Sequence, residues 1–116
     1  MDTGYEPLGL EFEKALTVLT TVIHKRPGAA VTDAGLKACY LDQGPPAIRG
    51  YPGIGVVLKE EHAILHDEKD ELAYLQKLEY EPAHCCSTVS LYDSYDCVRK
   101  GRWEASWTIP GRGKGR

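Results

Sequence analysis

The feature that most constrains the fold is residues 15–23, ALTVLTTVI, a run in which six of nine side chains are β-branched. Such side chains are stiff at χ1 and pack well on a pleated surface, so the run predicts a covered β-strand. It is followed by Pro27 and Gly28, a pair typical of tight turns. Residues 29–33 are therefore predicted to form the returning strand of a hairpin.

Further short strands separated by glycine and proline turns are predicted along the rest of the chain. Residues 56–59 and residues 76–81 have extended or alternating patterns. Residues 96–99 and 102–109 flank Lys100 and Gly101. Because glycine adopts a positive φ without strain, this pattern predicts a terminal hairpin.

Two segments are less definite: propensity does not decide the conformation of residues 34–40, and the charged residues 67–71 are interpreted as a solvated turn or the start of a helix. Many short strands with little helix indicate a mainly β domain, an antiparallel barrel-like or sandwich fold with at most one or two short helices.

Length and patterning divide the chain into one domain with two flanking segments. Its 116 residues suit a single core. Residues 1–14 contain Gly4, Pro7 and Gly9 without a clear period and are expected to be a connector or the end of a preceding domain. Residues 15–110 are the predicted β domain, and residues 111–116, GRGKGR, are expected to be a flexible basic tail.

The overall charge argues against several classes of partner. A formal net charge of −3 offers no concentrated basic surface for a phosphate backbone or an anionic membrane. The chain also has neither an apolar run of about 20 residues nor an N-terminal signal core. We therefore expect no nucleic acid, no membrane and a cytoplasmic location.

The four cysteines do not form a recognisable zinc-ribbon or redox pattern. Cys39, Cys85, Cys86 and Cys97 include no Cys-x-x-Cys pair. Adjacent Cys85 and Cys86 are not expected to be bridged to each other, because a disulfide requires Cα atoms further apart than neighbours lie.

Chemically capable side chains crowd together only in residues 82–88, PAHCCST. If residues 79–86 are extended, the period of two places His84 and Cys86 on one face and Cys85 on the other. An imidazole and a thiolate could then converge on one metal ion and leave coordination positions open, as catalytic zinc sites do. From spacing alone, the alternative of a buried hydrogen-bonded histidine and a small buried cysteine stays open.

A longer pattern resembles a known family. Residues 84–93, HCCSTVSLYD, have the form His-x-Cys-x-Thr-x-x-x-x-Asp. This pattern is similar to the metal-site segment of the fold-type III, pyridoxal-phosphate-dependent D-serine dehydratase and D-threonine aldolase family. Residues 15–23 with Arg26 and Pro27, and residues 31–37, VTDAGLK, match the same family in the same order.

The resemblance implies that the chain is the C-terminal β domain of a larger enzyme. Such enzymes first have a barrel that binds pyridoxal phosphate, then a β domain that supplies metal ligands, here His84 and Cys86, for zinc or another divalent ion. The metal would activate the β-hydroxyl of a small D-amino acid, and the parent is expected to be a homodimer. The cysteine ligand favours D-serine dehydratase over D-threonine aldolase, since some aldolases have aspartate there.

The resemblance also suggests secondary site residues. Thr88 and Asp93 match the motif and would lie in a second shell around the metal, or else only form local hydrogen bonds. Asp33, Lys37 and His62 could line the site, whereas His24 and His66 are expected to be solvated. Gly35 is expected to permit close backbone packing.

Two other functions stay open at this point. The chain could be a non-catalytic β domain for interaction or dimerisation, with a vestigial metal site. A self-contained zinc hydrolase is disfavoured because the chain has no His-Glu-x-x-His helix and no evident third ligand. No residue of the chain is assigned as catalytic or as binding pyridoxal phosphate.

Overall fold

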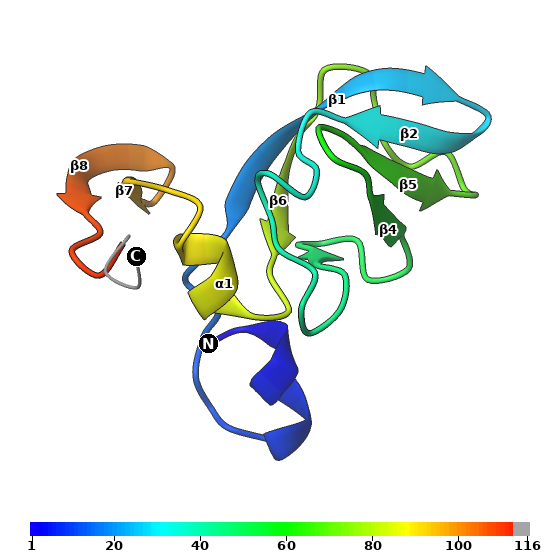
Figure 1. Ribbon diagram of the computed structural model, residues 1–116. Coiled ribbons are helices and arrows are strands. Elements are labelled where there is room, and N and C mark those ends of the chain that lie inside the picture. The colour runs from blue at the N-terminus through cyan, green and yellow to red at the C-terminus, as the bar shows by residue number, and fades with distance from the viewer. Residues whose placement is uncertain (113–116) are drawn as a thin grey trace.

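The computed structural model describes residues 1–112 and confirms a mainly β domain with two short helices (Figure 1). Six strands form one antiparallel sheet in the order β3-β6-β1-β2-β5-β4, and two more form a separate hairpin. No helix in the described part of the chain is long and apolar enough to cross a membrane. The elements are η1 (Thr3–Leu8), β1 (Val18–Arg26), β2 (Gly28–Thr32), β3 (Ala47–Ile48), β4 (Gly55–Leu58), β5 (Ala63–Asp67), β6 (Lys77–Glu81), α1 (Cys85–Val89), β7 (Ser94–Arg99) and β8 (Arg102–Thr108).

The first predicted hairpin is confirmed as β1 and β2. Gly28 has a φ of 76°, a conformation that a side chain would strain, and it begins β2 directly after the turn. β1 lies in the interior of the sheet, but only one of its faces is covered. Val18 and Val22 are buried, whereas Leu19 is 68% exposed, so the expectation of a covered strand holds for one face only.

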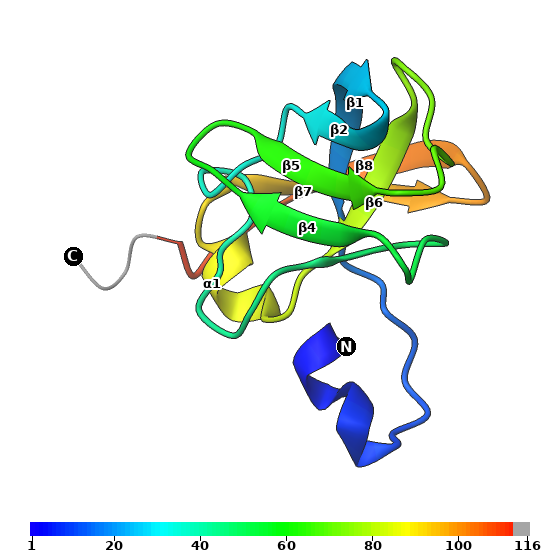
Figure 2. The same ribbon diagram turned by 90° about the vertical axis from the view of Figure 1, so that its right-hand side faces the viewer.

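The six-stranded sheet curls so that it nearly closes into a barrel (Figure 2). Its two edge strands, β3 and β4, come into contact although they stand at opposite ends of the strand order. Alternate side chains from the strands fill the interior, where Leu65 and Tyr80 are completely buried. The hydroxyl of Tyr80 lies 2.5 Å from that of Thr32, and burial raises the Tyr80 pKa to about 12.

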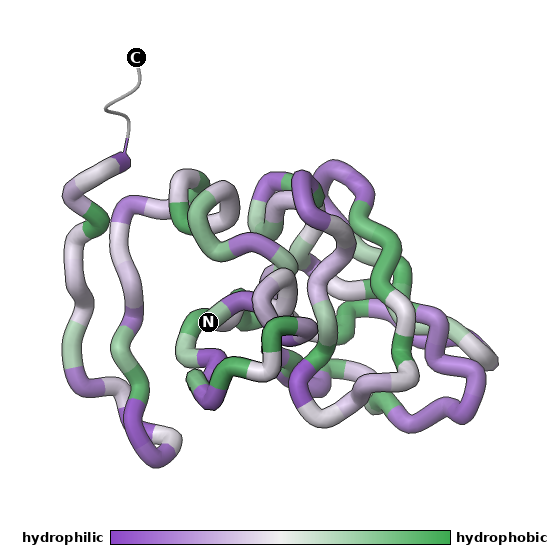
Figure 3. The backbone as a smooth tube through the Cα atoms, turned by 90° about the horizontal axis from the view of Figure 1, so that it is seen from below, coloured by the Kyte–Doolittle hydropathy of each residue, from purple (hydrophilic) through white to green (hydrophobic). Residues whose placement is uncertain are grey.

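The second predicted hairpin, β7 and β8, extends away from the barrel (Figures 1 and 3). Lys100 and Gly101 both have positive φ, 51° and 74°, as a tight two-residue hairpin turn requires. Trp103 and Trp107 are each 64% exposed on this ribbon. The hairpin is thus correctly predicted from the turn, but it adds nothing to the barrel core.

A close backbone contact at Gly35 joins the loop after β2 to the turn between β4 and β5. The amide of Leu36 donates to the carbonyl of Lys59 at 2.7 Å. A Cβ atom on Gly35 would lie 2.3 Å from the Lys59 carbonyl oxygen and 2.6 Å from that of Glu60. The expected role of Gly35 in close backbone packing is therefore confirmed.

Replacing Gly35 by alanine is expected to lower the free energy of unfolding by about 3 kcal/mol, at the upper end of overpacking costs, because the obstructing atoms are backbone. Gly53→Ala is the matched control, since its added Cβ would meet nothing within 4 Å. Urea denaturation of both variants measures the difference. Equal stability of the two would show that the contact relaxes without cost.

Candidate metal centre

The His-x-Cys motif lies where β6 ends and α1 begins, and not within a strand. β6 ends at Glu81, and α1 runs from Cys85 to Val89. His84 keeps extended angles, φ −141° and ψ 118°, as the residue before the helix, while Cys86 lies in the first helical turn. The strand predicted over residues 76–81 is confirmed as β6, but the extended conformation considered for residues 79–86 does not continue to Cys86, so a period of two cannot orient the two ligands. Pro82 is the signal that sequence reasoning missed, because proline cannot donate to a sheet ladder.

The ring of His84 is held by a carboxylate from a distant loop. Its Nδ1 lies 2.7 Å from Oδ2 of Asp42. The other carboxylate oxygen of Asp42 accepts a hydrogen bond of 2.8 Å from the Ser87 hydroxyl. The side chains of His84 and Asp42 are 32% and 31% exposed, and Cys86 is exposed. The imidazole and the thiol are thus accessible from solvent.

Two contacts fasten the loop that carries Asp42 onto the segment that carries His84. The buried Thr88 hydroxyl accepts the amide hydrogen of Tyr40 at 3.2 Å. The Tyr92 hydroxyl donates to the Ala38 carbonyl at 2.7 Å. Thr88 therefore anchors the loop on which Asp42 sits.

Asp93 lies outside this network of contacts. Its carboxylate is 85% exposed and forms an ion pair of 2.6 Å with Arg112, while its backbone carbonyl accepts from Ile109. Asp93 thus connects the start of β7 to the segment after β8.

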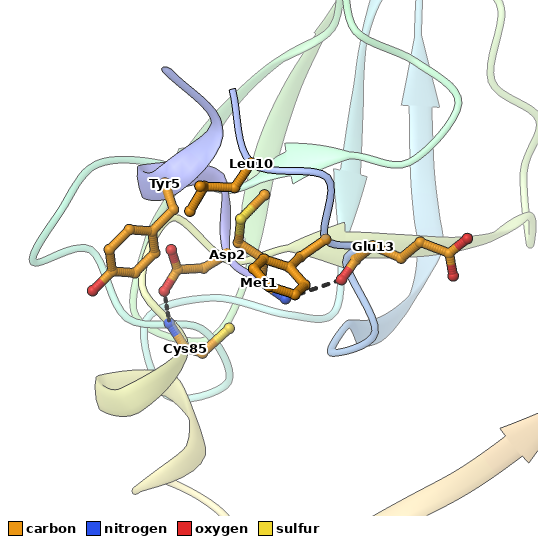
Figure 4. A pocket seen from close by; sticks show the side chains of 7 residues that line it. Met1, Asp2, Tyr5, Leu10, Glu13 and Cys85 are labelled. Carbon is orange, nitrogen blue, oxygen red and sulfur yellow. Dashed lines mark hydrogen bonds between the residues drawn. The ribbon is translucent and has the colours of Figure 1, made fainter. Parts of the chain in front are cut away.

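Electrostatics differ among the ionisable groups near the motif. Hydrogen bonds from His84 and Ser87 lower the pKa of Asp42, so it is a carboxylate at neutral pH. Burial, together with the nearby Asp2 carboxylate, raises the pKa of the Cys85 thiol. The Cys85 amide donates to Asp2 at 3.0 Å beside a shallow, largely apolar pocket (Figure 4). The four cysteines are free, so Cys85 and Cys86 are unbridged as expected.

The chemistry of the available donors suits a divalent metal, but the set is incomplete. Imidazole nitrogen and thiolate sulfur are the donors that zinc favours. Within residues 1–112, no group of three or more histidine, cysteine, aspartate or glutamate side chains is arranged to hold an ion. His84 and Cys86 could therefore supply two ligands, and the remaining positions would belong to water, substrate or another part of the protein.

The other predicted site residues lie along the loop after β2 and the turn before β5. The Asp33 carboxylate accepts from the Thr20 hydroxyl at 2.6 Å and from the Thr21 amide at 2.8 Å. Lys37 forms an exposed ion pair with Glu61, next to the exposed His62. No hydrogen bond or ion pair among residues 1–112 joins Asp33, Lys37 or His62 to the His84 motif. His24 and His66 are exposed, as expected.

The chain matches a known family over most of its length. The family described as "Putative serine dehydratase domain" matches residues 15–98, and the chain belongs to it. This match covers β1 through all but the last residue of β7 and includes His84 and Cys86. The family is one of lyases, as its relatives below indicate.

Relatives of known activity are aldolases and a dehydratase. The chain is 39% identical to 3-hydroxy-D-aspartate aldolase of Paracoccus denitrificans over 107 residues, which is 90% of this chain and 28% of the aldolase. Among solved structures, D-threonine aldolase from Filomicrobium marinum is similar with a TM-score of 0.83 at 28% identity, covering 90% of this chain and 30% of that one. A metal-free cysteine-to-alanine variant of D-threo-3-hydroxyaspartate dehydratase gives 0.70 at 25% identity, covering 81% and 31%.

Proposed function

We propose that this chain is the metal-binding domain of a larger lyase that depends on pyridoxal phosphate and a divalent ion and acts on small β-hydroxy D-amino acids. His84 and Cys86 are the proposed ligands, with zinc as the preferred ion. The pyridoxal phosphate would be held by a separate barrel domain, since the chain spans only 28% of the length of its aldolase relative. A parent of this kind is proposed to be a homodimer.

One observation carries the proposal: in a member of this lyase family, His84 is tied through Nδ1 to Asp42, and an exposed thiol follows two residues later. A metal-ligating histidine commonly donates its second ring nitrogen to a carboxylate in this way. When bound, the ion supplies Lewis-acid polarisation of the substrate's β-oxygen. The relative solved as a metal-free cysteine variant supports the same class of site.

Aldol cleavage is the reaction that we propose for the parent, with dehydration as the second candidate. Among solved structures, the D-threonine aldolase is 28% identical to this chain with a TM-score of 0.83, and the dehydratase variant is 25% identical with a TM-score of 0.70. Cys86 is the observation that favours dehydration, because some aldolases have aspartate at this ligand position. Glycine and an aldehyde as products would identify cleavage of a β-hydroxy D-amino acid, whereas ammonia and a keto acid would identify dehydration.

Titration of the 116-residue chain with Co²⁺ tests the metal site. We expect absorption from a thiolate bound to the ion, and at least about a tenfold weaker affinity for His84→Gln and for Cys86→Ser, since loss of even an outer partner costs that much. Cys97→Ser and His24→Gln are the controls, because they change the same residue types outside the motif. Unchanged affinity in both motif variants would argue for the alternative of a non-catalytic interaction domain.

A further inference from the structure

The His84–Asp42 contact has a specific chemical consequence for the imidazole. Asp42 is a carboxylate at neutral pH and can only accept hydrogen bonds, so a neutral His84 must carry its proton on Nδ1 to bond with it at 2.7 Å. Nε2 then bears the free lone pair. An exposed histidine without such a partner samples both tautomers, and its ring can rotate. The contact thus selects which nitrogen is available to an ion.

Asp42 is itself held in place by three independent constraints. The Ser87 hydroxyl donates to its second oxygen at 2.8 Å, which fixes the plane of the carboxylate. The Gly44 amide donates to the Leu41 carbonyl at 3.1 Å, closing a turn around Asp42, and Gly44 has a φ of 116°. On the other side of Asp42, Thr88 accepts from the amide of Tyr40 at 3.2 Å. A carboxylate held in this way can orient a neighbouring ring.

We propose that Asp42 is a positioning residue for the metal centre, which holds the His84 ring with its proton on Nδ1 and presents unprotonated Nε2 as the donor. The metal-binding part of this inference rests on the proposed function, whereas the hydrogen bond between Asp42 and His84 does not. Asp42 does not contact the ion; it acts through His84, as carboxylates behind metal-bound histidines do. Ser87 and Thr88 contribute by fixing Asp42 and its loop.

The first arm of the test needs no metal. The chain is labelled with ¹⁵N-histidine, and ring nitrogen shifts are recorded at a pH where the rings are neutral, with the His84 signals assigned from their loss in His84→Gln. Wild type is expected to show the Nδ1–H form, and Asp42→Ala a mixture in which the Nε2–H form of ordinary imidazole predominates. An unchanged tautomer in Asp42→Ala would overturn the inference.

The second arm measures Zn²⁺ affinity by calorimetry. Asp42→Ala is expected to bind Zn²⁺ about 10- to 100-fold more weakly than wild type. Asp96→Ala is the matched control, because Asp96 also accepts two side-chain hydrogen bonds, from Trp103 and Ser106, but lies on the separate hairpin. Amide spectra of both variants verify that each is folded.

The two arms separate this inference from the proposed function. A tautomer change with unaltered Zn²⁺ affinity would refute the positioning role of Asp42 while leaving the metal site intact. A wild-type chain that binds no Zn²⁺ would refute the proposed metal function, and the metal-free arm would still report whether Asp42 holds the His84 ring.

Discussion

In the full-length parent, His84→Ala and Cys86→Ala are each expected to lose the divalent ion and to fall at least about 100-fold in kcat/KM, a loss of about 3 kcal/mol of transition-state stabilisation. The physical reason is that a chain supplying only two ligands has no replacement when one is removed. Cofactor absorbance is expected to stay at the wild-type level, because the proposed pyridoxal phosphate site is in another domain.

Three measurements on each purified variant check this expectation: metal content, cofactor absorbance and initial rate with a β-hydroxy D-amino acid. Cys97→Ala is the control, since Cys97 lies on the hairpin strand β7 and is outside the motif. Full activity in a variant shown to be free of metal would contradict the proposed role of the ion. Loss of cofactor absorbance together with the metal would instead mean that the two sites do not separate.

Local signals in the sequence predicted the hairpins of this fold, whereas the closure of the sheet depends on contacts between distant residues. The Pro27-Gly28 and Lys100-Gly101 turns determine which neighbouring strands pair, so both hairpins were predicted correctly. The choice between barrel and sandwich depends on whether the edges of the sheet meet. Those edges are β3 and β4, of which β3 is only two residues long and has no detectable pattern.

The candidate site likewise contains residues that the sequence could identify and one that only the structure reveals. His84 and Cys86 could be selected because they lie two residues apart in a recognisable motif. Asp42 was missed because it is 42 residues from its partner, in a loop where an aspartate two residues before a glycine is indistinguishable from ordinary turn chemistry. Tertiary contacts bring that loop to the motif: Thr88 and Tyr92 bond to its backbone, and Ser87 bonds to Asp42 itself.

The charged segment that begins at the last residue of β5 shows a third limit of prediction from the sequence. Residues 67–71 are interpreted from the sequence as a solvated turn or helix start; residues 68–71 are indeed exposed, but Asp67 is completely buried. Its carboxylate accepts 2.5 Å and 2.8 Å bonds from Lys25 and the Glu71 amide, and a 3.1 Å bond from the Leu72 amide. Composition cannot reveal such burial, because a paired and fully hydrogen-bonded carboxylate is tolerated inside a protein.

Replacing Asp67 by alanine is therefore expected to lower the free energy of unfolding by about 3 to 5 kcal/mol, the usual cost of breaking a buried ion pair. The change leaves the Glu71 and Leu72 amides without their acceptor and removes the main partner of Lys25, which is 20% exposed. Asp70→Asn is the control: Asp70 has a φ of 51°, which asparagine tolerates, and contacts Lys25 more weakly at 3.4 Å from an exposed position.

The pH dependence of the difference in unfolding free energy between wild type and Asp67→Ala provides a second check. Burial alone would raise the pKa of Asp67, but the bonds from Lys25, Glu71 and Leu72 outweigh it and lower that pKa below 3.8. The hydrogen bond that Lys25 donates to Asp67 raises the pKa of Lys25 above 10.5 despite partial desolvation. An acid whose pKa is lowered by folding stabilises the folded state at pH values above the pKa that it has in the unfolded chain. A base whose pKa is raised by folding stabilises the folded state at pH values below the pKa that it has in the unfolded chain.

Urea denaturation should thus give a constant difference in the free energy of unfolding between wild type and Asp67→Ala from about pH 5 to 9. This difference should shrink below pH 3.8 and above pH 10.5. A difference that grew on acidification would show that Asp67 is protonated in the folded protein.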